Sequence, residues 1–356
     1  MQVYIDLHAL IHNARYILSK TGDKQVAAAV VKGDAYGHSI SLVVPTLVSL
    51  GITRFVVSNL KEAYAVWNLG AQWILVLHPS LDDIKELEYL PAPLNSAIRI
   101  AVWDFSILDI VPHHVPVHIA LSTGFGLGLE EIPDKFSNIY VEGIMGHMPF
   151  LDDTYDHQIL REKIYQSFVD SAKYYAEKHH IPEIHLCNSA TLFYLSGCKD
   201  TTMVRTGVGI YGYIEASNIR PELKPVMYQV GEIISIKDVK KGDTVFYGNV
   251  AENNMKIAFV RAGYGDGYAG GHYAYHIGSK QYISRVFDLT MNVTAFDVSG
   301  VSAKVGEKLL LLGNKARIRA DEVGKQTGIS TEKVLTKAGL SRRIVLPEDI
   351  KDLLQS

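Results

Sequence analysis

The stretch of sequence that decides the fold is 25–38, which reads QVAAAVVKGDAYGH. A short apolar run bounded by turn residues is typical of a buried strand. The run ends at Lys32, and Gly33 and Asp34 follow it directly. The stretch therefore predicts a buried strand that ends in a lysine.

Similar runs recur over residues 25–212, and longer helix-like segments such as 60–70 and 156–179 separate them. Strands that alternate with helices predict parallel βαβ units. An open, doubly wound sheet is one arrangement of such units. Eight units are the number in a closed (β/α)₈ barrel of the TIM type, which we therefore favour. The eight expected strands are 25–32, 54–59, 73–78, 98–104, 117–122, 140–147, 183–188 and 203–210.

Near residue 218 the pattern changes to closely spaced strands with Gly-, Asp- and Asn-rich turns, which predicts a mainly antiparallel β domain. A capped helix is expected from Ser330 to about Gly339. We therefore expect a barrel over 1–218 and a β domain over 219–356. Examples of the strands expected in the β domain are 228–238, 256–263, 281–287 and 308–313.

The composition is that of an ordinary globular protein, with 47% hydrophobic and 21% charged residues among 356. A net charge of −3 gives no electrostatic footprint for nucleic acid or an anionic membrane. No apolar run approaches the roughly 18 residues of a membrane span, and no charged-then-apolar leader follows Met1. Cys187 and Cys198 are expected to be structural, and no metal site is expected. We expect a cytoplasmic protein.

The carboxyl ends of the strands face the active site in a barrel enzyme. Lys32 ends the first expected strand, His147 ends the sixth, and Arg205 lies within the eighth. Burial lowers the pKa of a lysine and suits its amine to Schiff-base chemistry, although a lysine at the rim can simply reach solvent. Because His147 and Arg205 are expected at the same end of the barrel, we favour a functional role for Lys32.

A phosphate cradle is expected beside these residues. Ser189 follows the seventh expected strand, and Gly207 and Val208 follow the eighth. Their hydroxyl and backbone amides, together with Tyr36, would bind a phosphate without a cationic side chain.

Several motifs, taken in order along the whole chain, resemble the alanine racemase family. Agreement in both order and spacing is far more specific than any single motif. The matching segments are 5–7 with Asn13, 29–32 with 35–38, 143–147, His185 with 188–189, 204–207, 211–212, 247–248, 263–268, and 289–292 with Asp297.

The resemblance implies a homodimer that uses pyridoxal phosphate to interconvert L- and D-alanine. Lys32 would bind the cofactor covalently and act as one base. Tyr264, from the partner subunit, would be the base on the opposite face. Arg205 would pair with the pyridine nitrogen, and His147 would lie between Arg205 and Tyr264. The remaining cofactor contacts would come from Tyr36, Asn188, Ser189, Gly207 and Val208.

These roles suit racemisation, which removes a weakly acidic Cα proton and returns one on the other face. The cofactor ring spreads the negative charge, so the protein supplies geometry and bases. Arginine does not give up its proton to the ring nitrogen, a restraint that limits side reactions in the family. Positive charge on His147 and Arg205 would help Tyr264 to lose its proton.

The chain departs from the family pattern where the substrate carboxylate is held. Leu127 stands in place of the arginine that clamps the carboxylate, and Ala120 in place of its supporting lysine. We expect the backbone amide of Met291 to carry more of this binding, and the substrate to be bound weakly or to differ from alanine. Further departures are Thr331 for a phosphate-binding tyrosine, 269–270 for Pro-Arg, and Asn292 for an aspartate.

Three alternatives remain at this point. One is a racemase for another small amino acid, and a second is a nearly inactive or non-catalytic protein that binds the cofactor. The third is a barrel decarboxylase for basic amino acids, which would bring a cysteine from its β domain. Both cysteines here lie in the barrel half, which disfavours the third. A β domain that retains Tyr264 disfavours a non-catalytic protein, while a nearly inactive racemase stays open.

Overall fold

The computed structural model describes residues 1–23, 25–133, 139–149, 155–195, 197–214 and 222–355. The chain divides into two compact units. The first combines 1–10, 36–39 and 224–356, and the second combines 11–35 and 40–223. The predicted boundary between 218 and 219 falls among residues outside the described ranges, so it stays a prediction.

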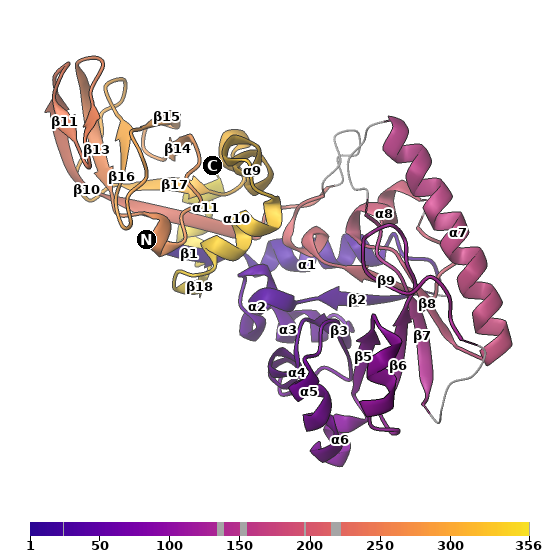
Figure 1. The fold of residues 1–356 in the computed structure, drawn as a ribbon. Coiled ribbons are helices and arrows are strands. Elements are labelled where there is room, and N and C mark those ends of the chain that lie inside the picture. The colour runs from indigo at the N-terminus through magenta and orange to yellow at the C-terminus, as the bar shows by residue number, and fades with distance from the viewer. Residues whose placement is uncertain (24, 134–138, 150–154, 196, 215–221, 356) are drawn as a thin grey trace. The chain divides into compact units, whose positions relative to one another are not determined.

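The second unit contains the eight predicted parallel strands, in the order β8-β7-β6-β5-β4-β3-β2-β9 (Figure 1). Hydrogen bonds from Thr202 N to Ile184 O, 2.8 Å, and from Arg205 N to Cys187 O, 2.9 Å, join the two ends of this order. The barrel prediction is therefore confirmed. The strands are β2 (Val26–Val30), β3 (Arg54–Val57), β4 (Trp73–Val76), β5 (Ile98–Val102), β6 (Val117–Ala120), β7 (Val141–Met145), β8 (Glu183–His185) and β9 (Met203–Thr206).

Helices connect these strands, and the long helix α7 (Tyr155–His179) packs against β8 (Figure 1). Asn59 and Ser80 cap α4 and α5 through their side chains, as short polar residues commonly do. The other helices of this unit are α3 (Ile40–Val48), α4 (Leu60–Trp67), α5 (Leu81–Glu86), α6 (Ala92–Asn95) and α8 (Ser189–Tyr194), while α1 (Leu7–Leu18) and α2 (Lys32–Tyr36) each have residues in both units.

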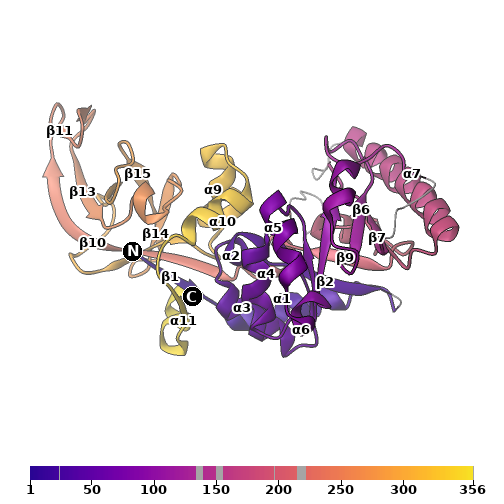
Figure 2. The ribbon, with the colours of Figure 1, turned by 60° about the horizontal axis from the view of Figure 1, so that its bottom comes forward.

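The first unit is built on an eight-stranded sheet in the order β13-β16-β15-β14-β17-β10-β1-β18. Neighbours are antiparallel except β1 and β18. Strand β10 pairs with β1, β17 and β13, which draws the amino terminus into this unit. Strands β1, β10 and β13 are labelled in Figure 2. The strands are β1 (Gln2–Ile5), β10 (Met227–Val239), β13 (Met255–Val260), β14 (Tyr273–His276), β15 (Gln281–Val286), β16 (Thr294–Asp297), β17 (Lys308–Leu312) and β18 (Arg343–Val345).

The four strands predicted for the β domain correspond to β10, β13, β15 and β17. The predicted helix is α10 (Thr331–Ala338), capped by the Ser330 hydroxyl, and it lies beside α9 (Ala320–Thr327). A two-stranded sheet of β11 (Thr244–Val245) and β12 (Asn249–Val250), and the helix α11 (Glu348–Gln355), complete the unit.

Two further features bear on the sequence predictions. Cys187 and Cys198 are both buried and bonded to each other as a disulfide, so the pair is structural, as expected. Across the described ranges, no helix is long and apolar enough to cross a membrane.

Candidate functional site

Lys32 follows β2 and begins a left-handed turn. Three residues after it, Gly33, Asp34 and Ala35, have φ of 64°, 53° and 58°, and Tyr36 continues with 52°. A left-handed conformation costs roughly 1–2 kcal/mol for each residue with a Cβ. Such strain persists only where surrounding structure imposes it, and it is common at functional sites.

The side chain of Glu62, in α4, holds this turn. Its Oε1 accepts hydrogen bonds from the backbone amides of Gly33, 2.7 Å, and Asp34, 3.3 Å, and its Oε2 accepts one from Ser58 N, 2.9 Å. The Asp34 carboxylate accepts from the amide of Ile40, 2.8 Å, at the far side of the turn. The position of Lys32 therefore depends on a carboxylate 30 residues away in sequence.

Replacing Glu62 with alanine is expected to lower the free energy of unfolding by about 2–3 kcal/mol, because charge-assisted hydrogen bonds to the strained turn are lost. Urea denaturation measures this. Glu62→Gln keeps an acceptor and should lose less, and Lys61→Ala, on the exposed face of the same helix, should lose almost nothing. Equal losses in Glu62→Ala and Lys61→Ala would contradict the role of this carboxylate.

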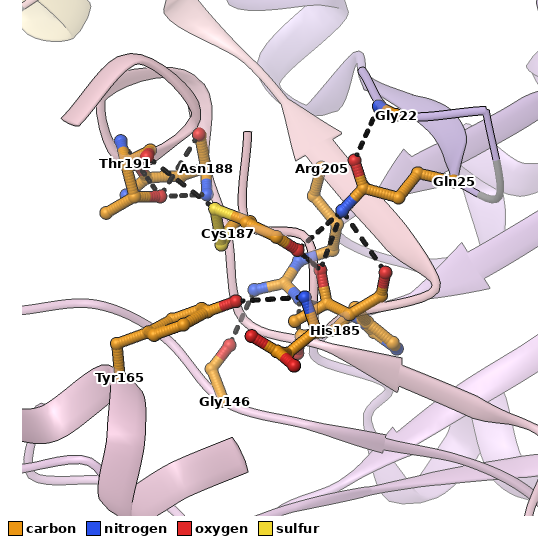
Figure 3. The surroundings of a disulfide bond; sticks show 12 residues. Gly22, Gln25, Gly146, Tyr165, His185, Cys187, Asn188, Thr191 and Arg205 are labelled. Atoms are coloured by element: carbon orange, nitrogen blue, oxygen red, sulfur yellow. Dashed lines mark hydrogen bonds between the residues drawn. A yellow bond between two sulfur atoms is a disulfide. The ribbon is translucent and has the colours of Figure 1, made fainter. Parts of the chain in front are cut away.

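Arg205 is buried in β9, and its guanidinium is held on one side by protein acceptors (Figure 3). Nη1 donates to His185 Nδ1, 2.5 Å, and to His185 O, 3.1 Å, and Nη2 donates to Gly146 O, 2.6 Å. These bonds use three of the five N–H groups of an arginine. Burial lowers the pKa of Arg205 to about 10, so it is still a cation at neutral pH.

His147 lies in the positive field of the same unit. Its pKa is lowered to about 3, first by burial and then by the charges of Arg205, Lys32 and His78. Its backbone carbonyl accepts from the Thr123 hydroxyl, and its ring contacts that of Phe125 with centroids 4.4 Å apart. His147 is therefore neutral at neutral pH, which differs from the positive charge expected of it.

The hydroxyl of Ser189 accepts hydrogen bonds from the amides of Gly207, 2.9 Å, and Gly209, 3.1 Å. These amides begin a short 3₁₀ helix, 208–211. A Cβ at position 209 would lie 2.9 Å from the Ser189 Oγ, so the glycine leaves this space open. The structure thus brings together Ser189 and Gly207 as expected, and adds Gly209, while Asn188 caps α8 through a side-chain bond to Thr191 N.

Tyr264 and Met291 lie side by side in the other unit. Tyr264 N donates to Thr290 O, 3.2 Å, and Gly265 N donates to Met291 O, 2.8 Å. A Cβ at Gly263 would collide with the backbone of Met291, so this glycine permits the close approach. Both side chains are exposed, at 51% for Tyr264 and 55% for Met291.

The remaining predicted site residues are placed as follows. Tyr36 belongs to the same unit as Tyr264, and burial followed by the charge of Glu332 raises its pKa. Thr331 is buried at the start of α10, and Leu127 is 48% exposed. The catalytic, cofactor-binding and substrate-binding roles of all the predicted site residues stay predictions.

Sequence reasoning missed Glu62 and a buried ionic cluster at the amino-terminal side of the barrel strands. Among the described residues, His118, Glu142 and Glu183 present ligand atoms within 4.8 Å of one another. Arginines already pair with both carboxylates: Arg99 with Glu142, 2.7 Å, and Arg54 with Glu183, 2.6 Å. Because these cations neutralise the acids, we interpret the cluster as an ion-pair network and not as a metal centre.

Known proteins match the chain over almost its full length. The model of the alanine racemase N-terminal domain matches residues 5–215, and that of the C-terminal domain matches 226–345. The alanine racemase of Clostridium tetani is 30% identical over 91% of this chain and 89% of its own length. That of Borreliella burgdorferi is 27% identical over 95% and 94%.

Solved structures share the fold. The alanine racemase of Bacillus anthracis with bound L-Ala-P has a TM-score of 0.81 and 24% identity, covering 98% of this chain and 95% of that one. The enzyme of Bartonella henselae with covalently bound pyridoxal phosphate has a TM-score of 0.80 and 20% identity, covering 97% and 99%. The two domain models together with these relatives show that the chain belongs to the alanine racemase family of pyridoxal-phosphate-dependent amino-acid racemases.

Proposed function

We propose that this racemase interconverts L- and D-alanine or a related small amino acid, with Lys32 and Tyr264 as its two bases. The observation that carries the proposal is the strained turn at Lys32, which Glu62 holds in the unit that also contains Arg205, His147 and Ser189. Strain of this kind is maintained where a side chain must be placed accurately.

The residues of the barrel fit pyridoxal phosphate. The Ser189 hydroxyl, which the amides of Gly207 and Gly209 hold in place, would form with the Val208 amide an uncharged donor set of the kind that binds phosphate. Arg205 has N–H groups beyond the three engaged by His185 and Gly146, and these suit a ring nitrogen. When bound, the cofactor supplies a conjugated ring that accepts the negative charge left by the Cα proton.

Lys32 and Tyr264 would hold and move the proton. The Lys32 amine takes or returns it on one face of the substrate, and the Tyr264 hydroxyl does so on the other. Arg205 and Lys32 keep positive charge around His147, and this charge favours the ionised form of an approaching tyrosine. The half-exposed Tyr264 supports a composite site in which it serves a second copy of the chain. A cytoplasmic homodimer that supplies D-alanine for the cell wall fits this proposal.

Replacing Tyr264 with phenylalanine is expected to lower racemisation by about 10²–10⁴-fold, as for loss of one catalytic base. Solvent deuterium should still enter the Cα position of one enantiomer without inversion, because Lys32 remains. Chiral separation coupled to mass spectrometry follows both processes. Tyr89→Phe, at an exposed tyrosine, is the control. Undiminished racemisation in the Tyr264 variant would remove this residue from the mechanism.

Substrate recognition is the part of the site that departs from the family. Leu127 follows β6 in the barrel unit and is 48% exposed, and its neighbour Phe125 contacts the ring of His147. Neither side chain donates to a carboxylate, so backbone amides such as that of Met291 would hold it. The same apolar pair favours a racemase for another amino acid as the second candidate function.

Leu127→Arg is expected to lower the KM for L-alanine by about 10–100-fold, because a guanidinium–carboxylate pair contributes on the order of 1.5–3 kcal/mol. Steady-state kinetics measures KM and kcat separately. Leu127→Met, which keeps the size and adds no charge, should leave KM as it is. An unchanged KM in Leu127→Arg would show that this position does not face the substrate carboxylate.

The whole proposal is tested with the cofactor-loaded protein and a panel of L-amino acids that includes alanine and serine. Chiral chromatography of each mixture is expected to show the D-enantiomer of alanine or of a related small amino acid. Formation of no D-enantiomer from any member of the panel, by protein that retains bound cofactor, would overturn the proposal.

A further inference from the structure

A line of hydrogen bonds runs from Arg205 into the ionic cluster of the barrel. Arg205 Nη1 and His185 Nδ1 are 2.5 Å apart, His185 Nε2 and His118 Nδ1 are 2.7 Å apart, and His118 Nε2 and Glu142 Oε2 are 3.1 Å apart. The four residues come from β9, β8, β6 and β7. Both histidines are fully buried, and the Glu142 side chain is only 12% exposed.

The donors in this line have a single consistent direction. Arg205 can only donate, so Nδ1 of His185 must accept, and the proton of this neutral ring is on Nε2. That N–H then donates to His118 Nδ1, which places the proton of His118 on its own Nε2, facing the Glu142 carboxylate. A protonated His118 would turn an N–H toward the N–H of His185. The donor at one end, Arg205, and the acceptor at the other, Glu142, therefore determine the tautomers of both histidines.

The charges agree with this direction. Burial, followed by the charge of Arg205, lowers the pKa of His185 well below its usual value, which keeps that ring neutral. Burial tends to raise the pKa of Glu142, but hydrogen bonds from His118 and Arg99 outweigh it and lower the pKa to about 2. The line thus begins at a cation and ends at a carboxylate.

The surroundings hold the far end of the line in place. Arg99 makes two bonds to the Glu142 carboxylate, 2.7 Å from Nε and 3.0 Å from Nη2, and the Trp73 indole N–H adds a third at 3.3 Å. A Cβ at Gly143 would overlap the His118 imidazole, so this glycine leaves room for the ring. Glu142 and His118 are therefore fixed in position.

We propose that Glu142 and His118 are positioning residues for the racemase: through His185 they fix the orientation and hydrogen-bond direction of the Arg205 guanidinium. With His185 held in a single tautomer, the Arg205 guanidinium keeps one orientation, and so do its remaining N–H groups. The effect on catalysis rests on the proposed contact between Arg205 and the cofactor ring, whereas the tautomers themselves do not.

The first measurement is the tautomeric state of His118 and His185 in the holoenzyme, from long-range ¹H–¹⁵N correlation spectra of ¹⁵N-histidine-labelled protein. Spectra of His118→Gln and His185→Gln assign the signals. Both rings are expected to be neutral with the proton on Nε2. A proton on Nδ1 of His185 would overturn the proposal, whatever the enzyme turns over.

The second measurement compares Glu142→Gln with Glu183→Gln. Glu183 is a matched control, because it also pairs with an arginine in this cluster and its Oε2 lies 4.0 Å from His118 Nε2, outside hydrogen-bond range. Glu142→Gln is expected to disturb the His118 and His185 signals, to shift the absorbance of the bound cofactor and to lower kcat/KM by about 10–100-fold, as loss of such supporting partners does. Glu183→Gln should leave the histidine signals and the cofactor absorbance unchanged, and kcat/KM within about twofold of the parent.

Equal effects of the two variants, at matched urea midpoints, would show a merely structural cluster and overturn the proposal. Gly143→Ala gives a second route that keeps every charge and collides with the His118 ring, and it should reproduce the changes in the histidine signals seen in Glu142→Gln. If the tautomers are as expected but no amino acid is racemised, the proposed function fails while the hydrogen-bonded line stands.

Discussion

Replacing Lys32 with alanine is expected to slow racemisation by about 10⁴-fold or more, the upper range for loss of a positioned acid–base group. The loss exceeds that for Tyr264 because Lys32 has two tasks, as a base and as the covalent attachment of the cofactor. Chiral chromatography measures the rate for both enantiomers.

The control for this variant is Lys61→Ala, which removes an exposed lysine from the neighbouring helix α4. The visible absorbance of the covalently bound cofactor should disappear in Lys32→Ala and persist in the control. A Lys32→Ala protein that keeps both the absorbance and more than about one-tenth of the rate would assign the cofactor to another amine.

The barrel is readable from the sequence because its signal is local. Each strand is a short, buried apolar run, and eight of them alternate with helical segments. The limits of the strands are less readable: β8 ends at His185 and not at residue 188, because Asn188 leaves the sheet to cap α8. Strands β14 and β16 were missed because four residues next to glycine- or asparagine-containing turns show too little alternation.

Some of the functional residues can likewise be predicted from the sequence, and others cannot. Lys32, Arg205 and Ser189 stand at strand ends, where a barrel places its active site, so their positions follow from the sequence. The left-handed turn does not follow from the sequence, since Asp34 and Ala35 prefer right-handed conformations and the distant Glu62 helps to hold them. In the sequence, His118 is marked only by its place inside an apolar strand. A histidine in such a place is more often an ordinary buried residue, so this feature does not predict a functional role.

Gly37→Ala is expected to lower the free energy of unfolding strongly. Gly37 has a φ of 82°, and a Cβ there would lie 2.5 Å from Leu335 O and 3.0 Å from the Cα of Gly339. All of these atoms are backbone, so no side chain can rotate away. Position 37 immediately follows Tyr36, so the collision would also move the end of the turn that begins at Lys32.

Two costs add in this variant and a control separates them. The left-handed backbone alone costs about 1–2 kcal/mol when a Cβ is added, and forced backbone movement in a packed site adds about 1–3 kcal/mol. Gly242 in the same unit has a φ of 91°, and nothing lies within 4 Å of a Cβ added there. Gly242→Ala therefore carries only the conformational cost. Urea denaturation of both variants should give losses of about 2–5 and 1–2 kcal/mol. Equal losses would mean that the end of α10 yields to the methyl group, and that the contact between Gly37 and Gly339 does not hold the turn after Lys32 in place.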